Sequence, residues 1–241
     1  MIEVKTKYSH ILYYAQKVSF KDVVIPSSYQ HFEGIYIPPF YRKEIHLTNV
    51  IDLTQDVDTL FSKIKSNTRN EIKRAIKEGY RCEFNQSYLE FISFYNDFAE
   101  LKSLPKLRCE QDLKQFNNPV ISLARSEEDV LAMHATAIDY ESKTAMLLYS
   151  CSVRLSDNID RKSIGWANRF LHFKEFEYLK QLGIERYDWN GICIDPEQIE
   201  KYNIGLFKQA FGGENIDNVW LFSPLQRIGN YFRKKIKSFQ S

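Results

Sequence analysis

Three neighbouring segments near the middle of the chain are rich in apolar residues and are separated by short polar stretches. Val120 to Arg125, Val130 to Tyr140 and Thr144 to Arg154 each carry the pattern of a β-strand. The short polar stretches SEED and ESK separate them and suit tight turns. The pattern predicts an antiparallel meander of three strands.

The C-terminal part of the chain changes to helical spacing. A long helix is predicted from about Trp166 to Leu182, because Gly183 provides a typical helix end. The remaining predicted elements are a strand at 184–189, a helix at 199–211, a strand at 219–222 and a basic helix from Leu225. This order predicts an α+β fold with a mixed, largely antiparallel sheet flanked by helices.

The first half of the chain predicts a smaller lobe. Residues up to Pro39 suit short strands and turns, and a basic amphipathic helix is predicted at 57–78, capped by Thr54 or Asp56. Further predicted elements are strands at 44–53 and 80–84 and helices at 88–102 and 110–116. We therefore expect an N-terminal lobe over residues 1–118 and a second lobe over 119–241, closely packed as one unit.

Composition narrows the possible classes of protein. With 241 residues, 44% of them hydrophobic, the chain can bury a core, and a formal net charge of +2 does not favour stable binding to nucleic acid. The four cysteines lack metal-ligand spacing, so we expect no metal and no disulfide framework. The N-terminus has no signal-peptide pattern and no apolar run is long enough to span a bilayer, so we expect a cytoplasmic protein without membrane insertion.

The motif KSIGWA lies where the predicted meander gives way to the long helix. A glycine at a helix start allows backbone N–H groups and the helix dipole to hold a pyrophosphate, although a plain glycine-containing helix start is an equally simple explanation. The motif resembles the pyrophosphate loop of GNAT acyltransferases, with lysine in place of the usual Gln or Arg. The resemblance implies acyl-CoA as co-substrate, bound by Lys162, Ser163, Ile164, Gly165, Trp166, Ala167 and Asn168.

A second resemblance covers more than half of the chain. The segments NTRNEIKRAIKEG at 67–79, YDWNGI at 187–192 and GLFKQAFGGE at 205–214 resemble Fem-type transferases, which have GNAT-like folds. That family includes nonribosomal peptidyltransferases that act on cell-wall precursors, and related sugar N-acyltransferases. The resemblance implies that Lys208 contacts a substrate phosphate or the developing negative charge. A solvated helix lysine is the alternative for Lys208.

Several other residues are candidates for binding substrate. Arg69, Lys73 and Arg74 carry charges that suit a nucleotide or lipid-linked pyrophosphate, although a solvated helix face explains them as well. The side chain of Asn190 could orient an amide of the donor or of the acceptor, or it could simply belong to a turn. Tyr36 is one of several aromatic residues that could stack on a base, and core packing is the alternative use.

Three residues are candidates for moving a proton. Asp188 shares a strand face with Asn190 and could bind a hydroxyl or accept a proton, or it could make a structural hydrogen bond. The imidazole of His134 lies in a predicted strand, and Tyr149 lies in the strand expected to flank the donor. Core packing is an alternative role for both His134 and Tyr149.

Together these features predict an N-acyltransferase that moves an acyl group from acyl-CoA to the amine of a nucleotide-linked amino sugar. A dTDP-linked aminodeoxyhexose for surface polysaccharide is the expected acceptor. Two alternatives remain open at this stage. One is a Fem-type transferase that uses aminoacyl-tRNA and acts on a peptidoglycan precursor, and the other is a noncatalytic binding module.

Overall fold

The predicted meander is present. Strands β6 (Val120–Arg125), β7 (Val130–Asp139) and β8 (Thr144–Ser152) pair as antiparallel neighbours. Successive residues face opposite sides: Leu123 and Met133 belong to one apolar cluster and Ala124 and Ala132 to another. Both faces of the meander are therefore covered, which explains why β7 is almost entirely buried.

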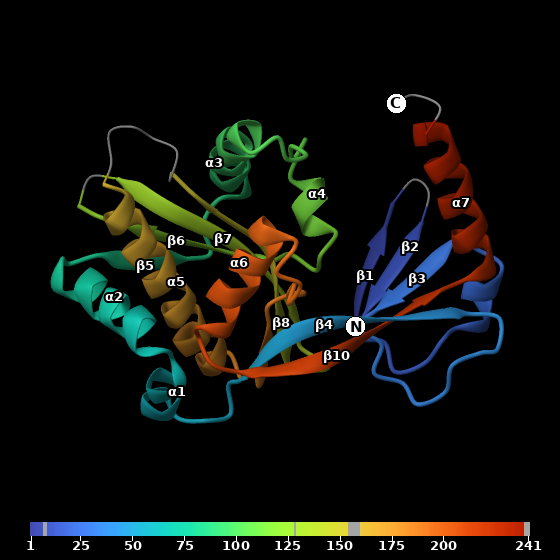
Figure 1. The fold of residues 1–241 in the computed structure, drawn as a ribbon, viewed down its shortest axis with the longest axis horizontal. Helices are drawn as coiled ribbons and strands as arrows, with labels where there is room; N and C mark the ends of the chain where they lie inside the picture. Colours follow the sequence, from blue (N-terminus) through green and yellow to red (C-terminus); the bar gives the residue numbers. More distant parts are fainter. Residues whose placement is uncertain (7–8, 128, 154–159, 239–241) are drawn as a thin grey trace. The chain divides into compact units, whose positions relative to one another are not determined.

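The computed structural model describes residues 1–6, 9–127, 129–153 and 160–238, and the chain divides into two units (Figure 1). The first unit joins Met1–Thr48 to Ile216–Ser241, and the second unit is Asn49–Asn215. These boundaries differ from the predicted division at residue 118. The reason is that the last strand of the chain returns to the N-terminal strands, so that Leu221 pairs with Tyr29.

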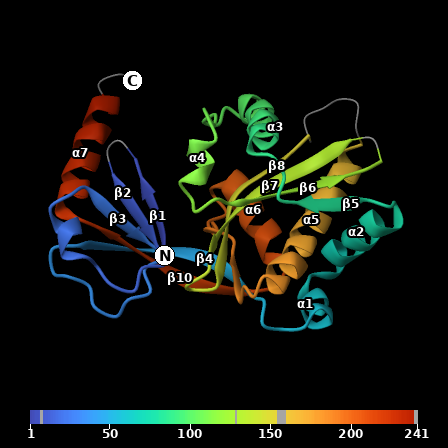
Figure 2. The ribbon, with the colours of Figure 1, turned by 180° about the vertical axis from the view of Figure 1, so that it is seen from behind.

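The second unit contains a mixed, largely antiparallel sheet with strand order β4-β9-β8-β7-β6-β5. Besides the meander, its strands are β4 (Arg42–Asp52), β5 (Arg81–Phe84) and β9 (Arg186–Asp188). Helices α2 (Ser66–Lys77) and α5 (Arg161–Gln181) pack together on one face, and α3 (Tyr88–Leu101) packs on β7 and β8 through the other apolar cluster. Figure 2 shows the meander in front of α5. The remaining helices of this unit are α1 (Val57–Lys63), α4 (Gln111–Lys114) and α6 (Ile199–Gln209).

The single helix predicted at 57–78 is wrong, because two helices occupy this segment. The Asp56 carboxylate caps α1 by accepting from the Thr59 amide at 2.8 Å. Ile64 then adopts an extended conformation with ψ 137°, and its side chain is buried with 1% exposure. Burial of Ile64 thus breaks a segment whose helical periodicity continues in the sequence.

The long helix begins earlier than predicted. Helix α5 starts at Arg161, and the carboxylate of Asp160 accepts hydrogen bonds from the amides of Lys162 and Ser163, both at 3.3 Å. An aspartate N-cap satisfies amides that would otherwise lack partners. The KSIGWA motif therefore lies inside the first turns of the helix and does not form a loop before it.

The first unit has the strand order β1-β2-β3-β10-β4. Its elements besides β4 are β1 (Ile2–Lys5), β2 (His10–Tyr13), the short 3-10 helix η1 (Phe20–Val23), β3 (Ser27–Gln30), β10 (Glu214–Phe222) and α7 (Pro224–Ser238). The core of this unit contains Leu12, Tyr29, Phe32, Tyr41 and Leu221. The buried Tyr29 hydroxyl donates to the Asp22 carboxylate, so η1 is held against this core.

Candidate active site

A cavity opens where two parallel strands of the second unit separate. β8 and β9 pair over only three positions, from Thr144 with Arg186 to Met146 with Asp188. β8 continues to Ser152, whereas the chain after β9 turns through Asn190 and Gly191, which have φ values of 54° and 93°. The divergence leaves a cavity of about 590 Å³.

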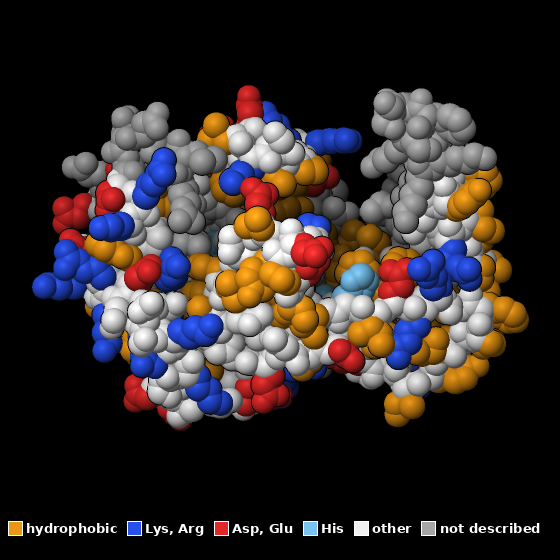
Figure 3. Space-filling view, viewed as in Figure 1, with side chains coloured by type: hydrophobic (Ala, Val, Ile, Leu, Met, Phe, Trp, Pro, Cys, Tyr) orange, Lys and Arg blue, Asp and Glu red, His pale blue; other side chains and the backbone are white. Residues whose placement is uncertain are grey.

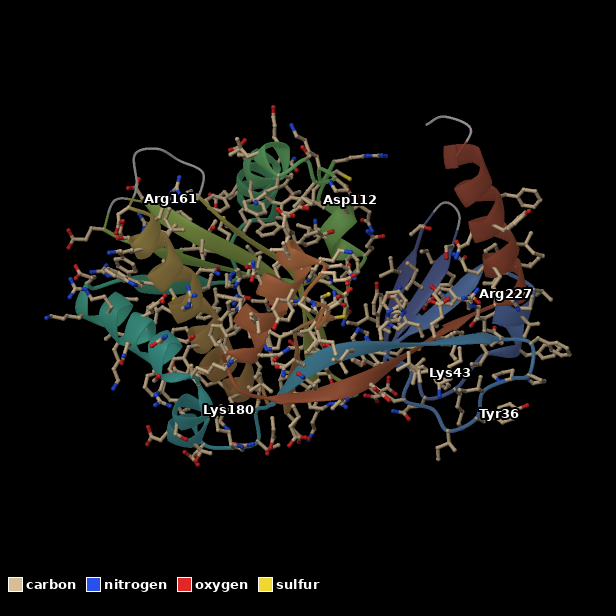
Figure 4. The ribbon with its side chains drawn as sticks, in the orientation of Figure 1. Tyr36, Lys43, Asp112, Arg161, Lys180 and Arg227 are labelled. Carbon is tan, nitrogen blue, oxygen red and sulfur yellow. The ribbon has the colours of Figure 1, made fainter. Side chains whose placement is uncertain are left out.

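Helices complete the walls of this cavity. Its lining comes from α3 (Phe98, Lys102), β8 (Leu147, Ser150, Cys151, Ser152), α5 (Arg161, Ile164, Gly165, Asn168, Arg169, His172), the residue after β9 (Trp189) and α6 (Asn203, Ile204, Phe207, Lys208). Figure 4 shows Arg161 at the start of α5. Four of the described lining residues are cationic and none of them is acidic. Such a lining favours an anionic ligand.

Lys208 connects α6 to the turn after β9. Its Nζ donates to the carbonyl oxygens of Trp189 and Gly191, both at 2.7 Å. Burial lowers the pKa of Lys208 to about 8, against the opposing effect of the Asp188 charge. Two of the three N–H groups thus hold the turn, and the ammonium lies at the cavity wall. Lys208 therefore shapes the cavity as well as adding charge to it.

Gly205 allows α6 to approach the segment after β9 closely. A Cβ atom at this position would lie 2.3 Å from the carbonyl oxygen of Cys193, which is far inside contact distance. The absent side chain lets the helix pack directly on backbone. This close approach helps to place Phe207 and Lys208, on the following turn, at the cavity.

A buried network of two imidazoles and a carboxylate lies behind the cavity wall. His172 and Glu175 come from one turn of α5, and His134 comes from β7. The Glu175 Oε2 atom is 3.1 Å from His134 Nδ1 and 3.2 Å from His172 Nδ1. The Ser122 hydroxyl donates to Glu175 Oε1 at 2.6 Å, and Tyr187 donates to Oε2 at 3.4 Å. The His134 and His172 rings stack with their centroids 4.0 Å apart.

The network holds His172 as a neutral hydrogen-bond acceptor. Burial lowers the pKa of His172 to about 3, and the charge of His134 contributes, so the ring is neutral near pH 7. Burial would raise the pKa of Glu175, but the charge of His134 and hydrogen bonds from His134 and His172 outweigh this effect and keep the pKa below its usual value. Because Nδ1–H of His172 faces the carboxylate, its Nε2 carries the lone pair. This buried atom has no hydrogen-bond partner in the structure.

Trp189 places an indole N–H donor near the His172 ring. Its indole ring lies 4.7 Å from the His172 ring, between centroids, and both residues line the cavity. The buried Nε1 atom of Trp189 also has no hydrogen-bond partner in the structure. The wall thus contains a donor and an acceptor whose bonding capacity is not used by the protein. Buried polar groups without partners are unusual and indicate a ligand or solvent position.

The same network is a possible metal site. His134, His172 and Glu175 offer ligand atoms within 4.8 Å of one another, the one such group in the part of the chain that the structure describes. Both imidazole Nδ1 atoms, however, lie at hydrogen-bonding distance from one carboxylate oxygen. A metal would have to replace both N–H donors, so the hydrogen-bonded form explains the arrangement without an ion.

The predicted donor-binding residues divide into two groups. Ile164, Gly165 and Asn168 line the cavity, and the Asn168 side chain reaches His134 Nε2 at 2.8 Å. The other four lie outside the described lining. The amides of Lys162 and Ser163 are bonded to Asp160, Ala167 is buried in the core, and Trp166 packs against it. The amides expected to bind a pyrophosphate are therefore already occupied in part.

The predicted phosphate-binding residues of α2 have local partners. The Arg69 guanidinium donates to the carbonyl of Ile64 at 2.7 Å and to that of Ser62, and thus caps α1. Lys73 lies over the Phe61 ring at 5.9 Å. Arg74 pairs with Glu78 at 2.7 Å and stacks over Trp166. None of these three is among the described residues that line the cavity.

The remaining predicted residues lie outside the described lining as well. Tyr149 packs against Tyr95 of α3 at 4.9 Å between ring centroids, and burial raises its pKa to about 12. Asp188 is buried and accepts from the Asn190 amide at 2.8 Å, so both residues form the turn after β9. His134 is buried in the network described above. Tyr36 belongs to the first unit, where its side chain is 73% exposed (Figure 4).

Sequence reasoning missed His172 and Glu175. Their spacing of three residues places both side chains on one side of α5, and Glu175 is polar at a position that would otherwise be core. A buried carboxylate in an apolar helix face requires a partner, and this was the available signal. Arg169 and Phe207, which stack at 5.1 Å in the cavity wall, were also missed.

Solved structures share this fold at low sequence identity. The C-terminal domain of a putative lysylphosphatidylglycerol synthetase from Agrobacterium fabrum aligns with a TM-score of 0.60 and 12% identity, over 91% of this chain and 79% of that one. L-PGS from Bacillus licheniformis aligns with a TM-score of 0.57 and 12% identity, over 92% and 79%. FemX aligns with a TM-score of 0.61 and 12% identity, over 85% and 68%. No protein-family model and no curated protein sequence matches the chain.

These similarities establish the class of fold. The chain has the GNAT-like fold of the Fem type, as the sequence resemblance implied. These structures do not support the branch of sugar N-acyltransferases.

Proposed function

We propose that the protein is a transferase that joins an activated aminoacyl group to an amine. The observation that carries this proposal is the His172 imidazole at the wall of a cationic cavity, fixed as an acceptor by Glu175. The cavity lies at the divergence of two parallel strands. The GNAT-like fold shared with FemX and the synthetase domains gives independent support.

The side chains of the cavity suit acyl transfer by direct attack. The amine nitrogen attacks the acyl carbon, a C–N bond forms and the ester C–O bond breaks. The Nε2 atom of neutral His172 accepts a hydrogen bond from the attacking amine and orients it, while Glu175 holds the opposite side of the ring. The amine proton passes to the leaving ester oxygen as the C–O bond breaks. Trp189 Nε1–H is suited to stabilise the negative charge that develops on the carbonyl oxygen.

The start of α5 favours an aminoacyl ester over acyl-CoA as donor. In the acyl-CoA reading, the amides of Lys162 and Ser163 would hold a pyrophosphate. The Asp160 carboxylate accepts from both amides, and its negative charge would repel a phosphate there. This disfavours the acyl-CoA reading, and with it the nucleotide-linked amino sugar has less support than the Fem-type alternative.

The charge of the cavity indicates the chemistry of the acceptor. Lys102, Arg161 and Lys208 line it without a described acidic neighbour in the lining, which suits an acceptor that carries phosphate. A peptidoglycan precursor, which carries both phosphate and an amine, fits this requirement. The Agrobacterium domain is named for making lysylphosphatidylglycerol, a product that joins an aminoacyl group to a phosphate-bearing molecule.

A titration experiment discriminates the two donors. The probes are CoA, acetyl-CoA and a 3′-aminoacylamino-3′-deoxyadenosine, a stable mimic of the aminoacyl-tRNA end. We expect saturable binding of the adenosine mimic by calorimetry and no binding of CoA. Binding of CoA alone would overturn the donor assignment and restore the acyl-CoA reading.

A transfer assay tests the reaction itself. The protein is incubated with bulk aminoacyl-tRNA and a muramyl-pentapeptide precursor, and the precursor is analysed by mass spectrometry for an added aminoacyl group. His172→Ala should lower the rate by about 100-fold, because the acceptor that orients the attacking amine is lost. The exposed His46, changed to alanine, is the matched control and should leave the rate unchanged. Equal rates for wild type and His172→Ala would exclude this role for His172.

A further inference from the structure

Helix α7 of the first unit packs with its polar side inward. Gln226 is buried, with 6% exposure, and its side-chain oxygen accepts from the Ser9 hydroxyl at 2.8 Å. Four apolar side chains in the described part of the helix are exposed instead: Leu225 by 40%, Ile228 by 53%, Tyr231 by 63% and Phe232 by 58%. A helix on the surface of a globular protein normally buries its apolar side. The orientation of α7 is the reverse.

A second apolar segment continues this surface. Phe20, in η1, is 87% exposed and Val24, directly after it, is 68% exposed. The Ser223 hydroxyl, immediately before α7, donates to the Ile25 carbonyl at 3.0 Å and ties the two segments together. Both segments lie at the same end of the first unit in Figures 1 and 2, and Figure 3 shows apolar side chains along this edge. We refer to Phe20, Val24, Leu225, Ile228, Tyr231 and Phe232 as the apolar edge.

Positive charge accompanies the apolar edge. The sequence of α7 contains five basic residues and no acidic one. Arg227 is exposed on the helix between Leu225 and Ile228 (Figure 4), and Lys21 is exposed in η1 beside Phe20. Exposed apolar side chains on a strongly basic amphipathic helix are typical of segments that lie in the interface of an anionic membrane.

We propose that the apolar edge docks the protein on the surface of a bilayer that contains anionic lipid. The apolar side chains would enter the interface while Arg227 and Lys21 contact the lipid phosphates. Self-association through the same edge is disfavoured, because it would bring two strongly basic helices together. No helix in the described ranges is long and apolar enough to cross a membrane. The proposal does not depend on the reaction proposed above.

The test is sedimentation of the full-length protein with lipid vesicles. We expect binding to vesicles of phosphatidylcholine and phosphatidylglycerol, with binding at least about tenfold weaker to phosphatidylcholine alone or at high salt. Ile228→Glu should weaken binding to the anionic vesicles by about tenfold or more, because it removes an apolar contact and adds a negative charge. Ile76→Glu is the matched control: Ile76 on α2 is also 53% exposed, and the change in charge is the same.

The remaining outcomes are also decisive. Equal weakening by Ile76→Glu and Ile228→Glu would show that net charge alone governs binding, and would overturn a role for the apolar edge. Absence of binding to anionic vesicles, together with a dimer in light scattering that Ile228→Glu dissociates, would identify the edge as a contact between two copies. Because Ile228 is exposed, circular dichroism should show that its variant is folded.

Discussion

Protonation of His172 should make the protein less stable in mild acid. The folded state lowers the pKa of this imidazole from 6.5 to about 3 through burial, whereas the unfolded chain takes up a proton near the ordinary value. Between these two values the unfolded state binds more protons, so the free energy of unfolding falls as the pH falls. From pH 7 to pH 5 the expected loss attributable to His172 is about 2 kcal/mol.

Urea unfolding at pH 7 and pH 5, followed by circular dichroism, measures this loss. His172→Gln removes the titrating group and retains a donor for Glu175, so the variant should lose about 2 kcal/mol less than wild type between the two pH values. The depressed pKa of Glu175 acts in the same direction but below its ordinary value of 4.5, which is outside this window. His46→Gln, at a side chain that is 43% exposed, serves as the control. If His172→Gln and wild type lose the same stability, His172 is not the buried neutral imidazole described above.

Three further predictions concern other residues of the second unit. Binding of inorganic pyrophosphate, measured by calorimetry, should weaken as the pH rises through about 8, because the Lys208 ammonium then loses its proton. The Lys208→Arg variant should retain binding to higher pH. An identical pH profile for both proteins would show that Lys208 does not contribute to anion binding. Gly205→Ala should lower the free energy of unfolding by about 1–3 kcal/mol, because the added Cβ would lie 2.3 Å from the Cys193 carbonyl oxygen. An unchanged midpoint in thermal unfolding would contradict this packing. Arg69→Met should lower the free energy of unfolding in urea by about 1–2 kcal/mol, because it removes the hydrogen bond to the Ile64 carbonyl. Lys73→Met loses only a contact over the Phe61 ring and should have a smaller effect. The opposite order would argue against the capping role of Arg69.

The sequence was most informative where short apolar runs are bounded by clear turn residues. The largely apolar strands of the meander have two buried faces, and both faces are covered. The helix predicted at 57–78 failed because Ile64 is apolar and fits a helical pattern, although it serves as a buried break between α1 and α2. Periodicity indicates which side chains are buried and does not show whether the backbone between them stays helical.

The site was harder to predict, because its chemistry arises from contacts distant in the sequence. His134 could be proposed as a proton carrier, but its partner Glu175 lies 41 residues further along the chain and His172 stacks on its ring. The expected pyrophosphate loop depended on where α5 begins. The Asp160 side chain sets that position by capping the helix. A motif defined by its glycine does not reveal these capping bonds.

The geometry of α5 also indicates where in the cavity the reaction would occur. The amides of Lys162 and Ser163 at the start of the helix are bonded to Asp160 and are not open to an anion, whereas His172 lies three turns further on and beside Trp189. Lys208 holds the backbone on the other side of Trp189 in place. In the proposed reaction, the donor would present its acyl carbon in the divergence of β8 and β9, where His172 and Trp189 are next to each other. The cationic residues Arg161 and Lys102, which are exposed, are then left to contact the phosphate-bearing part of a substrate nearer the solvent.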